Sequence, residues 1–444
     1  MTERLVVIGG DAGGMAAASG VRRLRPDVEI IVIERGGRTS YAMCGIPYVV
    51  GGEVDDVESL VARSPEEFGA MDIEVRLHTD AVSLDLDRRT VETRDLESGT
   101  TEVVAFDQLM IGTGARPVVP DWAEVDLPHV SVVHTLPDAA MLDGLAGGCA
   151  GREVVIVGGG YIGIEMAEAF LARGARVALV DRKAHLLGNL DPEMGERVDE
   201  VARAEGAELH LGVTAEALTP TSVITSTGAE LRADIVVLAL GVQPNTEMLS
   251  AAGLATGIRG ALVVDDHQRT SADGVYAAGD CCESFHRVSR QPTWIALGTV
   301  ANKASRVAGV NLAGGDATFG GVLGTAITRL VGTEIARTGL NVAQAVDAGF
   351  DPVATTVETT TRASYLPGSE PMVIRVVHDR SSGLLLGGQI VGGAGAGKRI
   401  DTIATALWAG FGVTELIDLD LAYAPPFSSV WDPVNTVARQ AARR

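Results

Sequence analysis

Cys44 is the residue of this sequence best placed to do covalent chemistry. It lies in the segment RTSYAMCGIPYVVGG (38–52), with no second cysteine and no histidine nearby. A thiol is nucleophilic only as its thiolate, and a helix N-terminus lowers the pKa of a thiol. Because Gly45 and Pro47 favour a helix start directly after Cys44, we expect a thiolate that attacks disulfides. The alternative, a buried cysteine that only packs, fits poorly in so glycine-rich a turn.

A glycine turn near the N-terminus has the pattern of a dinucleotide site. Residues 4–34 read as a buried strand, a glycine turn, a helix and a second buried strand that ends in Glu34. Glycines let a pyrophosphate approach, the helix N-terminus faces its charge, and the terminal acid accepts from a ribose hydroxyl. Asp11 stands at the second glycine position, so the match is incomplete. The residues of this turn are Gly9, Gly10, Asp11, Ala12, Gly13 and Gly14.

A second turn, in residues 152–181, matches the G-x-G-x-x-G fingerprint in full. Asp181 ends the following strand, and an acid there favours the free 2′-hydroxyl of NADH. Arg182 and Lys183 follow directly and could pair with the 2′-phosphate of NADPH. The chain is therefore expected to hold two dinucleotides, the second at Gly158, Gly160, Tyr161, Ile162 and Gly163.

The rest of the chain completes three domains. Asp280 follows a strand-ending glycine in VYAAGD (275–280) and can reach the polyol chain of a flavin, which suggests FAD in a discontinuous domain. From about residue 320, alternating segments (354–365 and 372–379) predict antiparallel strands, and 398–411 predicts a helix. The expected fold class is α/β with two Rossmann-like domains and a C-terminal α+β domain. The expected bounds are 1–114 with 243–319 for FAD, 115–242 for NAD(P)H, and 320–444 for the C-terminal domain.

Composition excludes several classes of function. The 444 residues carry a net charge of −22, which argues against nucleic-acid and acidic-membrane binding. No apolar run reaches the roughly 18 residues of a membrane span, and the sequence opens on a strand without a targeting signal. The four cysteines have neither metal nor disulfide-framework spacing. We expect a cytoplasmic protein without a metal, and we interpret Cys149, Cys281, Cys282, His286 and His378 as structural.

An ordered set of motifs in this sequence resembles those of the FAD-dependent pyridine nucleotide-disulfide oxidoreductases. The motifs are, in order along the chain, GGDAGG, SYAMCGIPYVVGG, GTGARP, GGGYIGIE, AAGDC, ANKASRVAG and YAPPFSSVWDPV. The resemblance covers essentially the whole chain. The resemblance is strongest to the single-cysteine branch, which includes coenzyme A-disulfide reductase, NADH oxidase and NADH peroxidase. Val49 stands where two-cysteine reductases carry their second cysteine. Ala12 stands where the oxidases and peroxidases carry a histidine, which counts against oxygen or peroxide as substrate.

The resemblance also implies roles for particular residues. In that branch the cysteine cycles between a thiolate and a mixed disulfide with CoA, and a tyrosine matching Tyr423 reaches the partner subunit's site in a homodimer. Tyr365 resembles a second such tyrosine. Arg22, with Arg23 beside it, lies where the family offers charge to the CoA nucleotide. Further substrate contacts are expected at Ser40 and Trp431, and further cofactor contacts at Glu34, Arg35, Val82, Thr113, Gly114, Glu165, Asp181, Gly241, Asp280, Ala296 and Leu297.

The expected function is a flavoprotein that passes electrons from NADH, or NADPH, through FAD to Cys44. Cys44 then reduces CoA disulfide or a similar low-molecular-weight disulfide or persulfide, and Tyr423 protonates the outgoing thiolate. Met43 and the pair Val430-Trp431 depart from the usual motifs, so a different disulfide could fit. Three alternatives remain: an oxygen-reducing NADH oxidase, a reductase for a ferredoxin or rubredoxin, and a flavoprotein with negligible turnover.

Overall fold

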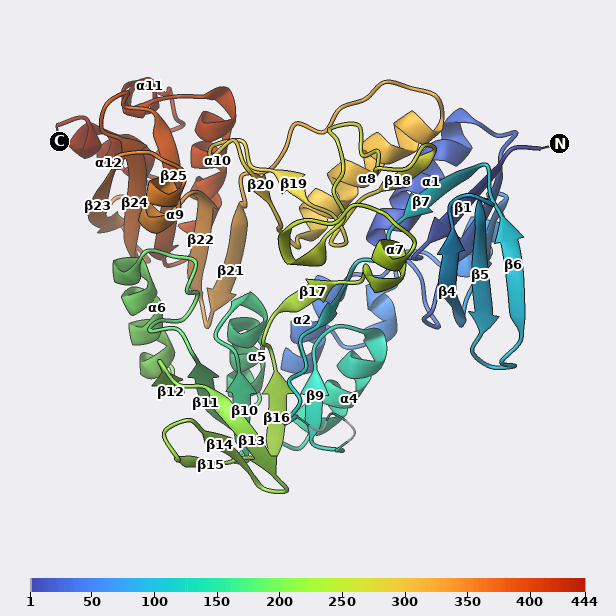
Figure 1. Cartoon of the computed structure of the whole chain (residues 1–444). Helices are drawn as coiled ribbons and strands as arrows, with labels where there is room; N and C mark the ends of the chain where they lie inside the picture. Colours follow the sequence, from blue (N-terminus) through green and yellow to red (C-terminus); the bar gives the residue numbers. More distant parts are fainter. Residues whose placement is uncertain (1, 124, 126, 444) are drawn as a thin grey trace.

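A five-stranded parallel sheet joins the N-terminal part of the chain to a strand far along the sequence. Its order is β18-β7-β1-β2-β3, and Figure 1 shows it on the side of the N-terminus. The inner strands are runs of Val, Ile and Leu buried on both faces, as parallel sheets require. The elements are β1 (Arg4–Ile8), α1 (Ala12–Leu24), β2 (Glu29–Ile33), β3 (Ile73–Arg76), β7 (Gln108–Ile111), β18 (Val275–Ala277) and α8 (Gly298–Leu312).

Shorter elements surround this sheet in the described residues, which are 2–123, 125 and 127–443 of the computed structural model. An antiparallel sheet of three strands, which the sequence analysis did not predict, is inserted after β3. The remaining elements are η1 (Met43–Gly45), α2 (Ile46–Gly51), η2 (Val57–Leu60), α3 (Pro65–Gly69), β4 (Thr79–Asp85), β5 (Thr90–Asp95), β6 (Thr101–Ala105), α7 (Glu247–Ala251), η3 (Ile258–Gly260), β19 (Ser284–Phe285) and β20 (Pro292–Thr293).

A second parallel sheet has the order β12-β11-β10-β16-β9. The chain enters and leaves this region through two short strands that pair with each other, β8 (Ala115–Pro117) and β17 (Val242–Pro244). The other elements are β9 (Val130–Val132), α4 (Leu136–Ala146), β10 (Glu153–Val157), α5 (Tyr161–Ala172), β11 (Arg176–Asp181), α6 (Pro192–Ala204), β12 (Glu208–Leu211), β13 (Ala215–Thr219), β14 (Ser222–Thr225), β15 (Glu230–Arg232) and β16 (Ile235–Leu238).

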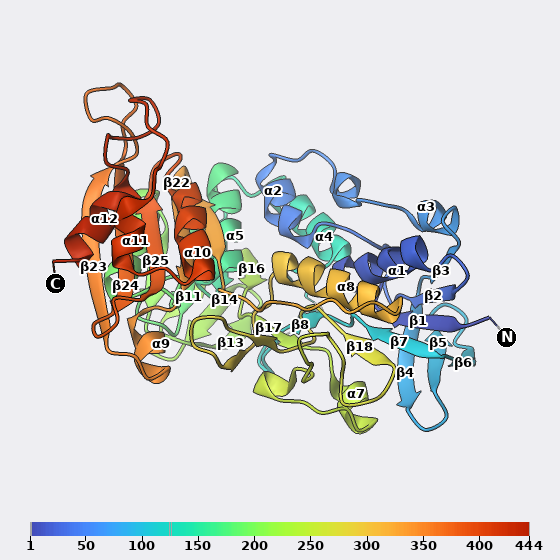
Figure 2. The ribbon, with the colours of Figure 1, turned by 90° about the horizontal axis from the view of Figure 1, so that it is seen from above.

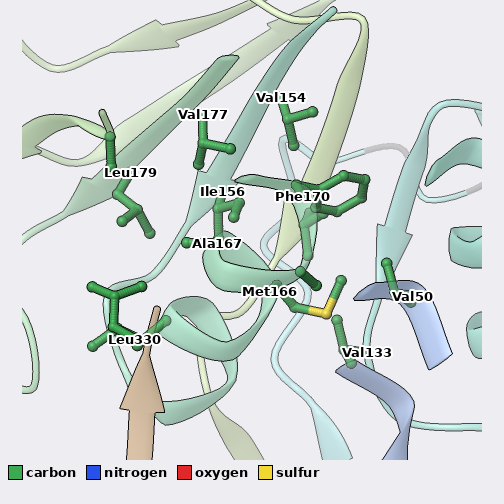
Figure 3. Packing of buried hydrophobic residues seen from close by; sticks show 14 of the residues in the cluster. Val50, Val133, Val154, Ile156, Met166, Ala167, Phe170, Val177, Leu179 and Leu330 are labelled. Carbon is green, nitrogen blue, oxygen red and sulfur yellow. The ribbon is translucent and has the colours of Figure 1, made fainter. Parts of the chain in front are cut away.

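The core of this second region extends into both neighbouring regions. Figure 3 shows Phe170 and Met166 of α5 packed beside β10 and β11. Val50 of α2 and Leu330 of β21 (Ala326–Leu330) belong to the same buried cluster. The helix that follows Cys44 is therefore held against the second dinucleotide unit by apolar packing.

The C-terminal region is an antiparallel sheet of order β21-β22-β25-β24-β23, covered by helices. This confirms the α+β prediction. The strand expected over 354–365 ends at Thr360, because the chain turns back and the Thr361 amide donates to Glu370 O at 2.9 Å. The further elements are β22 (Thr333–Gly339), α9 (Val342–Asp347), β23 (Pro352–Thr360), β24 (Pro371–Asp379), β25 (Leu385–Gly392), η4 (Gly397–Arg399), α10 (Ile400–Ala409), α11 (Val413–Asp418) and α12 (Pro433–Ala441).

The mixed α/β architecture with two Rossmann-like units is confirmed, whereas the exact domain bounds stay a prediction. Among the described residues, no helix combines the length and the apolar character needed to cross a membrane.

Candidate functional site

The first glycine turn is so tightly packed that it accepts only glycine at two positions. Gly9 has φ +104°, and a Cβ there would lie 2.2 Å from Gly112 O. A Cβ on Gly14 would lie 1.8 Å from Gly9 O. The carboxylate of Glu34 accepts from the amides of Gly10 and Gly36, each at 2.6 Å. The structure therefore brings the predicted strand, turn and acid together, and the backbone at the start of α1 carries no side chain at Gly13 or Gly14.

Asp280 reaches this turn from the end of β18. Burial raises its pKa to about 6, and the structure gives its carboxylate no hydrogen-bond donor among the described residues. A hydroxyl-rich ligand would supply that donor, since buried polar groups are normally hydrogen-bonded. Together with the glycine turn, this half-buried acid fits the ribityl and pyrophosphate parts of FAD.

The other residues predicted for FAD lie around the same edge of the sheet. Thr113 Oγ1 donates to Asn245 O at 2.7 Å, and Asn245 Nδ2 donates back to Thr113 O at 3.0 Å. Val82 lies where β4 shifts register between Ala81 and Ser83, a bulge of the kind common near binding sites. Gly114 follows Thr113 with φ +61°. Ala296 and Leu297 immediately precede α8, whereas Arg35 is exposed and lies 3.9 Å from Asp80.

The segment before Cys44 is tied directly to the first glycine turn. The Ser40 amide donates to Gly10 O at 3.0 Å, and the Tyr41 amide donates to Asp11 Oδ1 at 3.0 Å. Cys44 then lies in the short helix η1, exposed to solvent and directly before α2. Burial raises the pKa of Asp11 to about 6. The turn that fits the flavin thus also positions the thiol.

The expectation of a lowered pKa for Cys44 is wrong for this chain. Although Cys44 is exposed, nearby protein atoms reduce the solvation of its thiolate and so raise the pKa of Cys44, and the negative charges of Glu165 and Asp280 raise it further. The helix α2 spans only residues 46–51, so its dipole is small.

Glu165 approaches Cys44 from α5 of the second dinucleotide unit. Its Oε1 accepts from Thr328 Oγ1 of β21 at 2.9 Å, and burial raises its pKa. Next to it, Arg329 contacts Glu168 of α5 and Glu53 beyond α2. The sequence analysis missed Thr328 and Arg329, because nothing in a strand so far along the chain signals contact with the cysteine segment.

The second glycine turn repeats the geometry of the first. A Cβ on Gly158, whose φ is +116°, would lie 2.2 Å from Ala239 O, and one on Gly163 would lie 1.8 Å from Gly158 O. Asp181 accepts from the Gly159 amide at 2.5 Å and the Lys183 amide at 2.7 Å. Arg182 and Lys183 are exposed. The turn fits a second dinucleotide, and the two basic side chains are available to a 2′-phosphate.

The remaining residues predicted for this turn lie on both sides of it. Tyr161 and Ile162 begin α5, and burial raises the pKa of Tyr161. Gly160 lies beside open space, where an added Cβ would meet nothing within 4 Å. Gly241 follows β16 with φ +91° and accepts from the Val118 amide at 2.9 Å.

Tyr365, Tyr423 and Trp431 lie on loops of the C-terminal region and are exposed by 72%, 49% and 47%. Figure 2 shows these loops projecting on the far side of β22 from α2. Within one chain they do not join the cysteine site, so their predicted roles require a second copy.

Arg22, predicted to contact the CoA nucleotide, already donates to Pro26 O and Asp72 O, at 2.7 and 2.6 Å. All the individual site roles stay predictions.

The cysteines other than Cys44, and His286 and His378, are buried. Cys281 and Cys282 are buried free thiols with their sulfur atoms 3.6 Å apart, and Cys149 is buried. His286 and His378 are also buried. Within the described part of the chain, no group of three or more His, Cys, Asp or Glu residues could hold a metal ion.

Two family models match the chain. Residues 3–304 match the pyridine nucleotide-disulphide oxidoreductase model, and residues 325–434 match the dimerisation domain of the same family. A Pyrococcus furiosus protein named NAD(P)H sulfur oxidoreductase (CoA-dependent) is 38% identical over 440 residues, which cover 98% of each chain. A Methanocaldococcus jannaschii protein named NADH oxidase is 32% identical over 99% of each chain.

A solved structure extends the comparison. An NAD-dependent persulfide reductase from A. fulgidus superimposes with a TM-score of 0.95 at 34% identity, over 99% of this chain and 83% of that one. Several other relatives are named coenzyme A disulfide reductase.

Proposed function

Because this chain belongs to the pyridine nucleotide-disulphide oxidoreductase family, we propose that it reduces CoA disulfide, or a related low-molecular-weight disulfide or persulfide, at Cys44. The chain is a FAD-dependent NAD(P)H oxidoreductase of that family. The observation that carries the substrate proposal is one exposed cysteine, tied by its preceding segment to the first dinucleotide turn. With Val49 where a second cysteine would be needed, the disulfide partner of Cys44 has to come from the substrate.

FAD, when bound, accepts a hydride from NAD(P)H and supplies the two electrons that reduce a disulfide. The chain's own part begins with the Cys44 thiolate, which attacks one sulfur of the substrate disulfide. An S–S bond forms between Cys44 and that half of the substrate, and the other half leaves as a thiolate. Two electrons then break the mixed disulfide, which restores the Cys44 thiolate and releases the second thiolate.

Each thiolate leaving group requires a proton. Tyr423 supplies it from a second copy of the chain and regains its proton from solvent, because its loop is exposed and projects on the far side of β22 from α2, the helix that follows Cys44. The match to the dimerisation domain supports the homodimer that this arrangement needs. NADH is the preferred donor because Asp181 occupies the ribose end of its turn, and the free thiols suit the reducing cytoplasm.

Anaerobic NADH oxidation by the purified protein with CoA disulfide tests this proposal, with air as sole acceptor in a parallel assay. Fast turnover with CoA disulfide and slow turnover in air is the expected result. Fast turnover in air alone would establish the second candidate, an NADH oxidase, which relatives of that name favour. Turnover with neither acceptor would exclude CoA disulfide and oxygen as substrates, and the same assay with a persulfide and with other low-molecular-weight disulfides would then decide the rest of the proposal.

A further inference from the structure

Arg399 lies at the start of α10, outside the cofactor sites, with its side chain only 12% exposed. Its guanidinium donates to three backbone carbonyls: Gly395 O at 2.5 Å, Thr361 O at 2.9 Å and Phe427 O at 2.7 Å. Its Nε donates to Asp432 Oδ2 at 3.2 Å. One side chain thus ties together three loops that are far apart in the sequence.

Two of these loops carry the tyrosines of the proposed composite site. Thr361 opens the loop that holds Tyr365, and Phe427 belongs to the loop that holds Tyr423. The loops also bond to each other, because the Ala363 amide donates to Pro425 O at 3.1 Å. Figure 2 shows the brown and red loops projecting together beyond β23 and α12. Arg399 therefore lies at the base of the surface that presents both tyrosines.

Asp432 connects Arg399 to the last helix, α12. Its Oδ2 also accepts from Ser428 Oγ at 2.9 Å, and its Oδ1 accepts from the Val434 amide at 2.8 Å, which caps α12. The Arg439 guanidinium lies 4.1 Å from the ring of Trp431, directly before Asp432. The pair of Arg399 and Asp432 thereby fixes the loop between two helices while keeping the buried charge neutral.

The arrangement requires arginine in particular. A guanidinium offers five N–H donors in a rigid plane, whereas an ammonium offers three donors from a single point. Only the planar group can reach Asp432 and three carbonyls that approach from different directions. The tyrosine rings are exposed, so the backbone beneath them, and not packing around them, determines where they lie.

We propose that Arg399 is a positioning residue for disulfide reduction. It holds the Tyr365 and Tyr423 loops as one rigid surface, which a second copy of the chain receives at its Cys44. This inference rests on the proposed function, because it assigns the loops to the disulfide half of the reaction. It predicts that loss of Arg399 affects the disulfide substrate while leaving the reaction with NADH intact.

The test compares holoenzyme homodimers of the native protein, Arg399→Met and Arg399→Lys. Lys398→Met is the matched control, since Lys398 is the adjacent cation and, among the residues that the structure describes, pairs with Asp401 alone on the exposed side of α10. Three quantities are measured: kcat and KM for CoA disulfide, the anaerobic rate at which NADH reduces the bound flavin, and amide hydrogen exchange in peptides covering 361–371 and 420–432.

We expect Arg399→Met to lower kcat/KM for CoA disulfide about tenfold or more, since small displacements of a positioned group have effects of this size. Arg399→Lys should recover part of the loss. Flavin reduction by NADH should stay within about twofold of native, both loops should exchange faster, and Lys398→Met should match the native protein throughout.

Unchanged loop exchange in Arg399→Met would overturn the proposal, and so would faster exchange with unchanged kcat/KM. An equal loss of flavin reduction would also overturn it, because that pattern indicates general damage. If the native protein turns over neither CoA disulfide nor a related disulfide or persulfide, the proposed function itself fails. Loop exchange would then still decide whether Arg399 orders the two loops.

Discussion

The chemistry at Cys44 depends on charges that the sequence places far from it. Glu165 and Asp280 lie on different elements, and both raise the pKa of the thiol. A motif predicts which residue is nucleophilic, but the electrostatic environment of that residue is set by side chains that only the fold brings near. The sequence therefore predicts a reactive thiol at Cys44, and this stays a prediction, whereas the direction of its pKa shift could be obtained only from the fold.

Replacing Cys44 tests the central assignment. Cys44→Ser should retain bound FAD yet lower disulfide turnover by about 100-fold or more, because a hydroxyl at neutral pH is a far weaker nucleophile than a thiolate. Flavin absorbance and anaerobic NADH oxidation with CoA disulfide measure the two properties. Cys149→Ser is the control, since Cys149 is a buried free thiol, whereas Cys44 is exposed. Native turnover in Cys44→Ser would exclude the mechanism.

Asp280 gives the apoprotein a pH-dependent stability. Its folded pKa of about 6 lies above the ordinary value of 3.8, so the folded state binds more protons than the unfolded state between these values. Burying the charged carboxylate costs free energy, whereas burying the protonated acid does not. The free energy of unfolding is therefore highest below about pH 4, and it falls by up to about 3 kcal/mol as the pH rises through 6.

Asp280→Asn should remove this dependence, because the amide keeps the shape without the buried charge. Thermal unfolding of the apoprotein at pH 4 and pH 7 measures it. The variant should gain stability relative to the native apoprotein at pH 7 but not at pH 4. A difference between the two proteins that is independent of pH would contradict the assigned pKa.

At the scale of elements, both strand–turn–helix units could be predicted because their requirements are local. A buried strand, a turn of bare backbone and an acid at the next strand end leave a strict pattern in the sequence. The inserted strands β4 to β6 were missed, although Val82, Leu84 and Leu86 alternate with polar residues in the pattern of a strand. The end of β23 at Thr360 was also missed, because a hydrogen bond across the loop decides it.

The first glycine turn provides a test at this scale. Gly14→Ala would place a methyl group 1.8 Å from Gly9 O, so the turn must open and FAD binding should weaken strongly. Gly144→Ala is the matched control, because a Cβ there meets nothing within 4 Å in α4. The control should be stabilised by about 0.5–1 kcal/mol. Flavin content after gel filtration, with Tm, measures both, and full flavin content in Gly14→Ala would refute the packing argument.

Across the whole molecule, a buried ion pair joins the second dinucleotide unit to the C-terminal sheet. Asp191, at the start of α6, accepts from Arg375 Nε at 2.7 Å, from Gln389 Nε2 at 2.9 Å and from the Val342 amide at 2.9 Å. Its side chain is 3% exposed. Regions distant in the sequence thereby meet at one buried carboxylate.

Breaking this pair should loosen the junction between the two regions. Arg375→Met leaves the Asp191 carboxylate buried without its cation, which costs about 3–5 kcal/mol of unfolding free energy. Arg380→Met is the matched control, because the pair of Arg380 and Asp351 is exposed and contributes at most about 1 kcal/mol. Denaturant unfolding of the two variants measures the difference. Equal losses of unfolding free energy would show that the buried pair contributes no more to stability than the exposed pair.

The sequence by itself determined the two dinucleotide units, the solitary cysteine and the antiparallel C-terminal region, because turns, alternation and residue chemistry act over short stretches of chain. Only the tertiary structure placed Thr328 against Glu165, Asp191 against Arg375, and Arg399 beneath the two tyrosine loops. These contacts join residues from separate elements, and their energies arise from burial and charge that exist only after the elements have packed.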